Sequence, residues 1–269
     1  MILKIGIVGI GSIGSTVALE LDKGTIPGIE LVALAARNKD KLETFSRELN
    51  RSVAIGNLNS WVDKCDLVIE ASGASTVDQI VRSSLANGKD VMILSVGALI
   101  ENKSLIELAQ EENKKIHIPS GAIAGLDGIK AAAFGDIKDV TIINRKPPSA
   151  LKGSPGAKSS QIDLDSLSEP YTLFSGTVAE GYRLFPANVN VAVAVSLAGV
   201  GVDKTKMEVI VDPNIELNVH EVTLDSSIGR MSLFIEGKAS DKNPRTSDST
   251  AFSVLSYLSQ MVSHIKIGT

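Results

Sequence analysis

A glycine motif near the N-terminus constrains the fold more than any other feature of the chain. It has the spacing G-x-G-x-x-G and consists of Gly9, Ile10, Gly11, Ser12, Ile13 and Gly14. A mostly apolar run, Ile2–Val8, leads into it, and a helical pattern from Ser15 to Lys23 follows. In that position Gly9 allows a tight turn, Gly11 lets the backbone approach a pyrophosphate, and Gly14 lets the helix pack against the strand. Because free N–H groups at a helix start bind phosphate, the motif predicts a dinucleotide site.

The alternation of strand and helix continues to residue 120. Apolar runs typical of buried strands occupy residues 31–36, 66–71, 90–95 and 115–119. Helical patterns lie between them, at residues 39–49, 77–87 and 103–113. Such alternation is typical of a parallel sheet covered by helices, so the sequence predicts an α/β fold with an N-terminal Rossmann domain.

The second half of the chain has a different pattern. Residues 149–162 are rich in Ser, Gly, Lys and Ala, and we expect a mobile surface loop there. The uncharged stretch Leu184–Val202 contains Pro186 and two asparagines, which favours a buried helix over a membrane span. Strand-like runs follow at 206–211, 216–224 and 231–237, and the short turns between them predict an antiparallel sheet. The chain closes with an amphipathic helix at 247–264.

Composition excludes several classes of function. Hydrophobic residues make up 43% of the 269, and 27 cationic against 31 acidic residues give a formal charge of −4, which is typical of a soluble globular protein. A weakly acidic chain with 4% aromatic residues is an unlikely nucleic-acid partner. The single Cys65 excludes an intrachain disulfide, and we expect a reducing compartment, the cytoplasm. No residue pattern with metal-ligand spacing is present, so we expect no metal.

The end of the second expected strand bears on the choice of cofactor. NAD-binding folds place a carboxylate there to hold the ribose 2′-hydroxyl. Here the chain reads Leu34-Ala35-Ala36-Arg37-Asn38, without a carboxylate. Arg37 is suited to a bidentate contact with a 2′-phosphate, which would let NADP bind alongside NAD. The alternative is a solvated cation at the strand end.

Among the three histidines, His220 is the strongest candidate for proton transfer. His117 lies within an apolar strand, and His264 lies near the C-terminus. His220 lies mid-strand, where a period of two places it on one face with Asn218 and Val222. A face that mixes polar and apolar residues is typical of a site wall, and imidazole moves protons near neutral pH. An ordinary strand histidine is the alternative.

The chain resembles the L-aspartate dehydrogenase family over nearly its whole length. Besides the glycine motif, the resemblance rests on IPSGAIAGLD at 118–127, LFPANVNV at 184–191, NVHE at 218–221 and NPRTS at 243–247. The glycine motif is common to many dehydrogenases, whereas the other four in this order are much more specific. No departure from the family pattern occurs at these motifs.

The resemblance implies a two-domain fold. The Rossmann domain would comprise residues 1–120 with 241–269, the C-terminal helix packing back on it. Residues 121–240 would form a second α/β domain, for substrate binding and catalysis. Its open-faced, mostly antiparallel sheet would also carry the contacts of a homodimer.

The resemblance also implies a reaction. L-aspartate would be oxidised at Cα by hydride transfer to NAD or NADP, as the first step of NAD biosynthesis. The product, iminoaspartate, hydrolyses to oxaloacetate and ammonia. By position, His220 matches the family's active-site histidine, and Ala124 and Asn190 match its cofactor contacts. The substrate carboxylates need cationic or N–H partners, for which the sequence offers Arg145, Lys146, Lys152, Arg183 and Arg245 without choosing among them.

Two other readings stay open at this point. A related two-domain reductase could act on another acid, such as homoserine or dihydrodipicolinate. A non-catalytic sensor could bind the dinucleotide without turnover, because fold alone does not fix function. Reduction of NAD(P)+ that depends on an amino acid separates an enzyme from a sensor.

Overall fold

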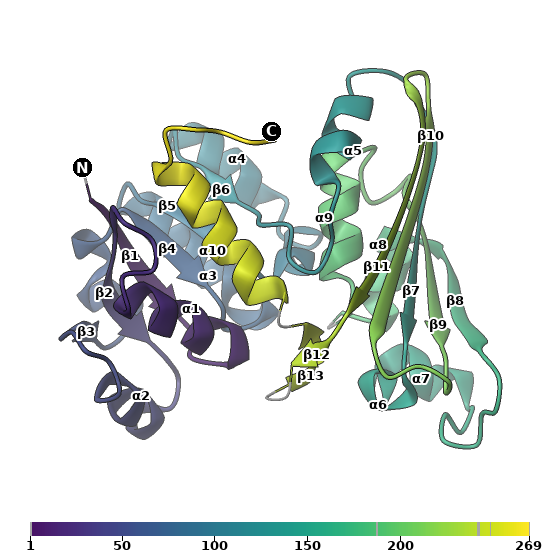
Figure 1. Cartoon of the computed structure of the whole chain (residues 1–269), viewed down its shortest axis with the longest axis horizontal. Helices are drawn as coiled ribbons and strands as arrows, with labels where there is room; N and C mark the ends of the chain where they lie inside the picture. The colour runs from purple at the N-terminus through teal and green to yellow at the C-terminus, as the bar shows by residue number, and fades with distance from the viewer. Residues whose placement is uncertain (1, 187, 241–242, 248, 269) are drawn as a thin grey trace. The chain divides into compact units, whose positions relative to one another are not determined.

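The computed structural model describes residues 2–186, 188–240, 243–247 and 249–268, and for 239, 240 and 243–247 it describes the backbone alone. Within these residues the chain forms two compact units, each with its own large sheet (Figure 1). The first unit comprises the chain up to Pro119 together with Ala251–Ile267. The second comprises Ser120–Thr250 with the end of the chain.

A six-stranded parallel sheet forms the centre of the first unit, in the order β3-β2-β1-β4-β5-β6. Its strands are β1 Leu3–Val8, β2 Ile29–Ala35, β3 Ala54–Ile55, β4 Leu67–Glu70, β5 Asp90–Ile93 and β6 Ile116–His117. The helices are α1 Ser12–Asp22, α2 Lys39–Ser46, α3 Ala74–Ala86, α4 Ser104–Glu111 and α10 Ser249–Val262, with short 3-10 turns η1 Leu58–Ser60, η2 Val62–Lys64 and η3 Val96–Leu99. The strand order reverses between β1 and β4, and α/β sheets bind ligands at the carboxyl ends of strands at that point. The predicted Rossmann sheet is confirmed.

The core of the first unit explains why its strands read as continuous apolar runs. Helices cover both faces of the sheet, so the successive residues Ile5, Gly6 and Ile7 of β1 are all buried. The C-terminal helix α10 contributes four apolar residues at helical spacing to this core, namely Ala251, Val254, Leu255 and Leu258. Helix α10 therefore packs on the first unit although more than 130 residues of intervening chain belong to the second.

A five-stranded mixed sheet forms the second unit, in the order β11-β10-β7-β9-β8. Its strands are β7 Ile137–Lys146, β8 Tyr171–Thr177, β9 Lys206–Val211, β10 Asn218–Ser226 and β11 Gly229–Gly237, and β12 Ala239–Ser240 and β13 Asn243–Ser247 form a separate small ribbon. The helices are α5 Leu126–Ala132, α6 Pro148–Leu151, α7 Pro155–Ser160, α8 Val178–Leu184 and α9 Asn190–Ala198. Helices α5 and α9 cover one face of the sheet and leave the other open (Figure 1), so buried and half-buried residues alternate along β7. The open-faced, mostly antiparallel sheet is confirmed.

The segment expected to be a mobile loop, residues 149–162, instead contains most of α6 and all of α7. Pro148 and Pro155 occupy the first turn of each helix. Backbone N–H groups there have no acceptor within the helix, so proline's lack of an N–H costs no hydrogen bond. The Ser154 hydroxyl accepts a hydrogen bond from the Ala157 N–H and caps α7. Buried Leu151 and Ala157 anchor both helices. Proline and serine act here as helix starts, which composition alone does not distinguish from loop residues.

Two further expectations about the second half were wrong in detail. The stretch 184–202 is not one helix, because α8 ends at Leu184, Pro186 follows, and α9 begins only at Asn190. The runs at 206–211 and 216–224 are not neighbours, because β7 lies between β9 and β10 and pairs with β9 in parallel. Only β10 and β11 form the expected antiparallel hairpin. No helix in the described part of the chain has the length and apolarity to cross a membrane.

Candidate functional site

The glycine motif and the end of β2 meet at one cavity of the first unit. The cavity has a volume of about 740 Å³, within the range of small-molecule sites. Of the predicted cofactor-binding residues, Gly9, Ile10, Gly11 and Arg37 line it, whereas Ser12, Ile13 and Gly14 lie in the first turn of α1 behind them. The fold thus brings together residues separated by more than twenty positions in the sequence.

The three glycines differ in the space around them. Gly9 has φ +108°, and a Cβ there would overlap the carbonyl of Ala71. A Cβ on Gly14 would overlap the carbonyl oxygen of Gly9. Gly11, the N-cap of α1, has no atom within 4 Å of a Cβ position and no side-chain cap. Gly9 and Gly14 are therefore required by the turn, while Gly11 faces open space at the N-terminus of α1, which fits a bound pyrophosphate.

Cationic side chains line the cavity where the chain leaves β2. Arg37, Lys39 and Lys41 line it together with Glu43, and all four are exposed. Strand β2 ends at Ala35 with no carboxylate in the next three residues. Arg37 forms no ion pair or hydrogen bond with any residue that the structure describes. The rim therefore carries net positive charge where a ribose 2′-substituent would lie.

Glu70, which the sequence analysis did not single out, organises the neighbouring strand ends. It is the last residue of β4 and is completely buried. Its carboxylate accepts hydrogen bonds from the N–H groups of Ser72, Gly73 and Ser95, at 2.7, 2.8 and 3.0 Å. These bonds hold the turns after β4 and β5 in place, and Ser72 lines the dinucleotide cavity. A carboxylate that ends an apolar run and precedes Ser and Gly is the sequence signal for such a role.

In the second unit, His220 lies on the helix-covered face of the sheet. It is 3% exposed and stands opposite Asn144 of β7. Its Nδ1 lies 2.7 Å from the Oδ1 of Asn144. Because an amide oxygen only accepts, Nδ1 carries the proton, and the lone pair is on Nε2. The pairing fixes the tautomer in which Nε2 can take up a proton.

Lys146 lies on the same face and interacts with His220. Burial, together with the charge of Lys146, lowers the pKa of His220 to about 3. Burial also lowers the pKa of Lys146 to about 8. The ammonium donates to the Oδ1 of Asn218 at 3.3 Å. His220 is therefore neutral and Lys146 mostly charged at neutral pH.

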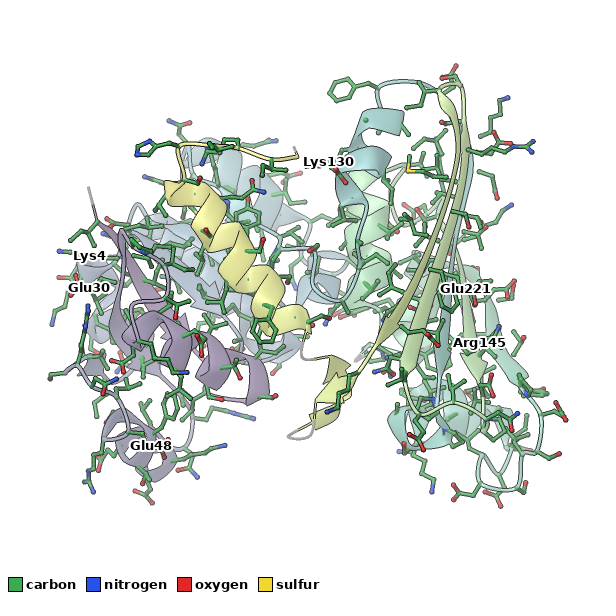
Figure 2. The ribbon with its side chains drawn as sticks, in the orientation of Figure 1. Lys4, Glu30, Glu48, Lys130, Arg145 and Glu221 are labelled. Carbon is green, nitrogen blue, oxygen red and sulfur yellow. The ribbon has the colours of Figure 1, made fainter. Side chains whose placement is uncertain are left out.

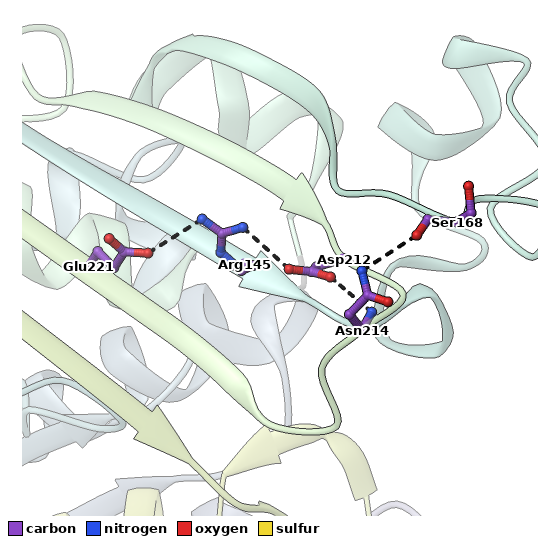
Figure 3. A network of polar contacts seen from close by, with 5 residues as sticks. All are labelled: Arg145, Ser168, Asp212, Asn214 and Glu221. Atoms are coloured by element: carbon purple, nitrogen blue, oxygen red, sulfur yellow. Dashed lines mark hydrogen bonds and ion pairs between the residues drawn. The ribbon is translucent and has the colours of Figure 1, made fainter.

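Arg145, the neighbour of Lys146, belongs to a different environment. It lies on the open face of the sheet, where Figures 2 and 3 label it beside Glu221. Its guanidinium lies 3.3 Å from Asp212 and 3.6 Å from Glu221. Asp212 also accepts from the Asn214 N–H, and the Asn214 amide reaches the Ser168 carbonyl (Figure 3). Two carboxylates thus compensate the charge of Arg145.

The remaining predicted site residues are distributed over the second unit. Ala124 is exposed in the turn before α5, and Asn190 is the first residue of α9. Among the other candidate cations, Lys152 pairs with Asp165 at 2.5 Å, and Arg183 is exposed. The side chain of Arg245 lies outside the described residues.

The other singled-out residues belong to the first unit. His117 of β6 lies 3.0 Å from the Tyr257 hydroxyl on α10 and 3.3 Å from Asp90. Its partners link α10 to the sheet edge, so a structural role is sufficient for it. His264 is exposed beyond the end of α10. Cys65 is buried, and burial raises the pKa of its thiol to about 11.

Comparison with known proteins divides the chain in two. Residues 127–261 match the family model described as the C-terminal part of aspartate dehydrogenase. Residues 9–119 match the NAD-binding domain of homoserine dehydrogenase. An L-aspartate dehydrogenase of Methanosarcina barkeri is 41% identical, covering 99% of this chain and 100% of its own. One from Bradyrhizobium diazoefficiens is 39% identical, covering 99% and 94%.

Solved structures show the same fold. An aspartate dehydrogenase of Thermotoga maritima superposes with a TM-score of 0.75 at 24% identity, covering 100% of both chains. A homoserine dehydrogenase of Thiobacillus denitrificans gives a TM-score of 0.63 at 14% identity, covering 97% of this chain and 73% of that one. These likenesses establish the architecture, and the relatives with higher identity bear on the chemistry.

Proposed function

The chain belongs to the L-aspartate dehydrogenase family, and from that premise we propose which of its residues carry out the reaction. The enzyme oxidises L-aspartate at Cα with NAD(P)+ and forms iminoaspartate, which hydrolyses to oxaloacetate and ammonia. This is the first step of NAD biosynthesis from aspartate. The observation that carries the assignment of residues is the buried pair His220–Asn144, which leaves a proton-accepting nitrogen in the second unit.

The cofactor supplies an acceptor for the hydride that leaves the substrate. The glycine turn from Gly9 to Gly14 would hold its pyrophosphate, because Gly11 faces open space there. Arg37 would hold a 2′-phosphate at the cationic rim of the same cavity. Ala124 and Asn190 would make further cofactor contacts, as their positions in the family motifs suggest.

His220 would act as the base that prepares the substrate. An α-ammonium group holds its nitrogen lone pair in an N–H bond, so Cα cannot release a hydride until one proton leaves. The Nε2 of His220 accepts that proton, while Asn144 keeps Nδ1 protonated and the ring in one orientation. A neutral imidazole at physiological pH is the state this step needs.

The second unit favours aspartate over the substrates of related reductases. The match to the homoserine dehydrogenase family model spans residues 9–119 only, whereas the match to the aspartate dehydrogenase model spans 127–261. The dinucleotide-binding half is therefore common to several enzymes. The half that contains His220 carries the substrate assignment.

Absorbance of the reduced nicotinamide tests the function directly. Purified protein is given L-aspartate with NAD+ or NADP+, with D-aspartate, L-glutamate and L-homoserine as controls. We expect reduction only with L-aspartate. Reduction with L-homoserine instead would favour a related reductase, and cofactor binding without any turnover would favour a sensor.

The choice of cofactor is tested at Arg37. Because its guanidinium has no described ion-pair partner at the cavity rim, Arg37→Ala should weaken NADP+ binding and leave NAD+ binding nearly unchanged. Loss of a bidentate phosphate contact weakens binding by about tenfold or more. Dissociation constants of both cofactors for both proteins measure the effect. A preference for NAD+ that the substitution does not alter would contradict the assignment.

The quaternary structure and location are further parts of the proposal. We expect a homodimer that uses the open face of the second sheet. A cytoplasmic location suits the buried Cys65, whose thiol has no cysteine partner in the sequence.

A further inference from the structure

Lys146 carries a buried charge with no compensating carboxylate. Its side chain is 4% exposed, and its ammonium donates to a neutral amide, the Oδ1 of Asn218. Among the described residues no carboxylate forms an ion pair with it. A buried ammonium without a partner of opposite charge destabilises a protein by about several kcal/mol. Titratable groups with strongly shifted pKa values cluster at functional sites, and an anion would compensate this charge.

A second polar group on the same face also has no partner. The Nδ2 of Asn144 is buried and makes no hydrogen bond in the structure, and Asn144 is 1% exposed. Its Oδ1 is already engaged with His220, so the amide cannot turn without breaking that bond. A buried N–H donor left unsatisfied is rare in native proteins and indicates an absent acceptor.

Strand register places these groups within reach of one small molecule. Asn144 and Lys146 are two positions apart on β7 and therefore share a face, as do Asn218 and His220 on β10. His220 stands directly opposite Asn144, and Asn218 contacts Lys146 one step along the pair. Neighbouring side chains in such a patch begin about 5–7 Å apart. A ligand that contacts Lys146 and Asn144 therefore lies beside His220.

We propose that Lys146 and Asn144 together bind one carboxylate of the dicarboxylate substrate, next to the base His220. This inference rests on the proposed function and specifies how its substrate is recognised. The carboxylate supplies the negative charge that the ammonium lacks and the acceptor that the Asn144 amide lacks. Asn218 holds the ammonium in position and is a positioning residue.

Binding of the anion also changes the pKa of His220. In the free protein the charge of Lys146 adds to burial in disfavouring the imidazolium. A bound carboxylate compensates that charge and so raises the pKa of His220. His220 becomes a stronger base only when substrate is present. The site thus couples recognition of a dicarboxylate to removal of the proton from its amine.

Succinate is the probe for this site, because it has both carboxylates of aspartate and no amine to oxidise. Calorimetric titration measures its affinity for the cofactor-loaded enzyme and for Lys146→Met. We expect the variant to bind succinate at least about 30-fold more weakly, since an uncompensated charge contact is removed. Cofactor affinity should stay the same. Equal succinate affinity in both proteins would overturn the inference.

Arg145→Met is the matched control. It removes the adjacent cation of the same strand, but that cation lies on the open face and is paired with Asp212 and Glu221. We expect succinate affinity to be unchanged. A loss equal to that of Lys146→Met would indicate a general charge effect and contradict a specific subsite.

Proton uptake by the unaltered enzyme tests the same point without a variant. The described titratable group facing Lys146 is His220, while Asp212 and Glu221 are engaged by Arg145. Near pH 8 Lys146 is partly deprotonated, so succinate binding should take up as much as about half a proton. Titrations in buffers of different ionisation enthalpy measure it. Binding without uptake would contradict the assignment.

These measurements separate the subsite from the reaction. If the enzyme fails to oxidise L-aspartate but Lys146→Met still loses succinate binding, the proposed function fails and the carboxylate site stands. If oxidation proceeds and succinate binding does not depend on Lys146, the site fails alone. L-asparagine, which lacks the β-carboxylate, identifies the carboxylate when it is used as a ligand rather than as a substrate. If Lys146→Met weakens the binding of L-aspartate only, the β-carboxylate contacts Lys146; if it weakens the binding of both amino acids equally, the α-carboxylate does.

Discussion

At the scale of single residues, His220 provides the most direct test of the mechanism. His220→Ala removes the proton acceptor and should lower kcat by about 10²–10⁴-fold. The dissociation constant of the cofactor should hardly change, because the dinucleotide cavity is in the other unit. Steady-state kinetics and fluorescence titration measure the two quantities. His264→Ala replaces an exposed histidine and should leave both unchanged; near-normal turnover in His220→Ala would remove His220 from the mechanism.

The buried charge of Lys146 should lower the free energy of unfolding of the protein. In the unfolded chain its amine takes up a proton near pH 10.5, whereas in the folded protein it does so only near pH 8. Stability is therefore lost as the pH falls from 10.5 to 8, and the whole penalty is present below pH 8. Lys146→Met lacks this penalty and should be more stable at neutral pH by up to about 3 kcal/mol.

Urea unfolding of the two proteins across that pH range tests the expectation. The difference in the free energy of unfolding should be largest near pH 7 and should close by pH 10.5. A difference that does not depend on pH would show that packing, rather than the buried charge, separates the variants.

The residues of the site differ in how far the sequence predicts them. The glycine motif is local, so Gly9, Gly11 and Gly14 are assigned from spacing alone. His220 is found because period-two alternation places it on a mixed face. The roles of Asn144 and Lys146 depend on the pairing of β7 with β10, which joins residues more than 70 positions apart. Sequence spacing alone does not distinguish Arg145 from Lys146. Their side chains lie on opposite faces of β7, and only the packing of helices on the sheet buries one face and leaves the other open.

At the scale of elements, the turn between β1 and α1 offers a matched pair of substitutions. Gly14→Ala places a methyl group onto the Gly9 carbonyl oxygen, so the helix must shift and stability should fall by about 1–3 kcal/mol. Gly11→Ala meets open space and should leave stability nearly unchanged, but its methyl group projects where the pyrophosphate would lie. Thermal unfolding without cofactor separates the two variants, and cofactor titration should show weaker binding in Gly11→Ala. Normal cofactor affinity in Gly11→Ala would contradict the placement of the pyrophosphate.

The elements themselves were predicted best where the periodicity is strong and the partners are close in the sequence. The strands β1, β2, β4 and β5 read as apolar runs because helices cover both faces of their sheet. Strand β8, Tyr171–Thr177, was not predicted, because none of its residues is buried and its alternation is weak. Helices α6 and α7 are four and six residues long, too short for a helical period to stand out. Proline at their first turns was read as a loop signal.

At the scale of the whole molecule, function is divided between the units. The first unit contains the dinucleotide cavity and the fold shared with many dehydrogenases. The second contains His220 and the uncompensated Lys146 on the helix-covered face of its sheet, where we propose that the dicarboxylate is recognised. Substitutions at the cavity rim around Arg37 should therefore change the cofactor preference, and substitutions on β7 and β10 should change the substrate preference. The two sets of residues lie on different elements of the chain.

The open face of the second sheet leads to a prediction about assembly. Phe234 of β11 is 63% exposed there, opposite Glu221 of β10. In a symmetric dimer each copy contributes the same face, so one substitution acts twice. Phe234→Lys should raise the dimer dissociation constant by about tenfold or more, since exposed aromatic residues often carry interface energy. Sedimentation equilibrium measures it, with 28.3 kDa as the mass of one chain. The control is Phe252→Lys, because Phe252 on α10 is 60% exposed but lies in the other unit, and it should leave the dimer intact. A monomeric wild-type protein, or equal effects of both substitutions, would exclude this face as the interface.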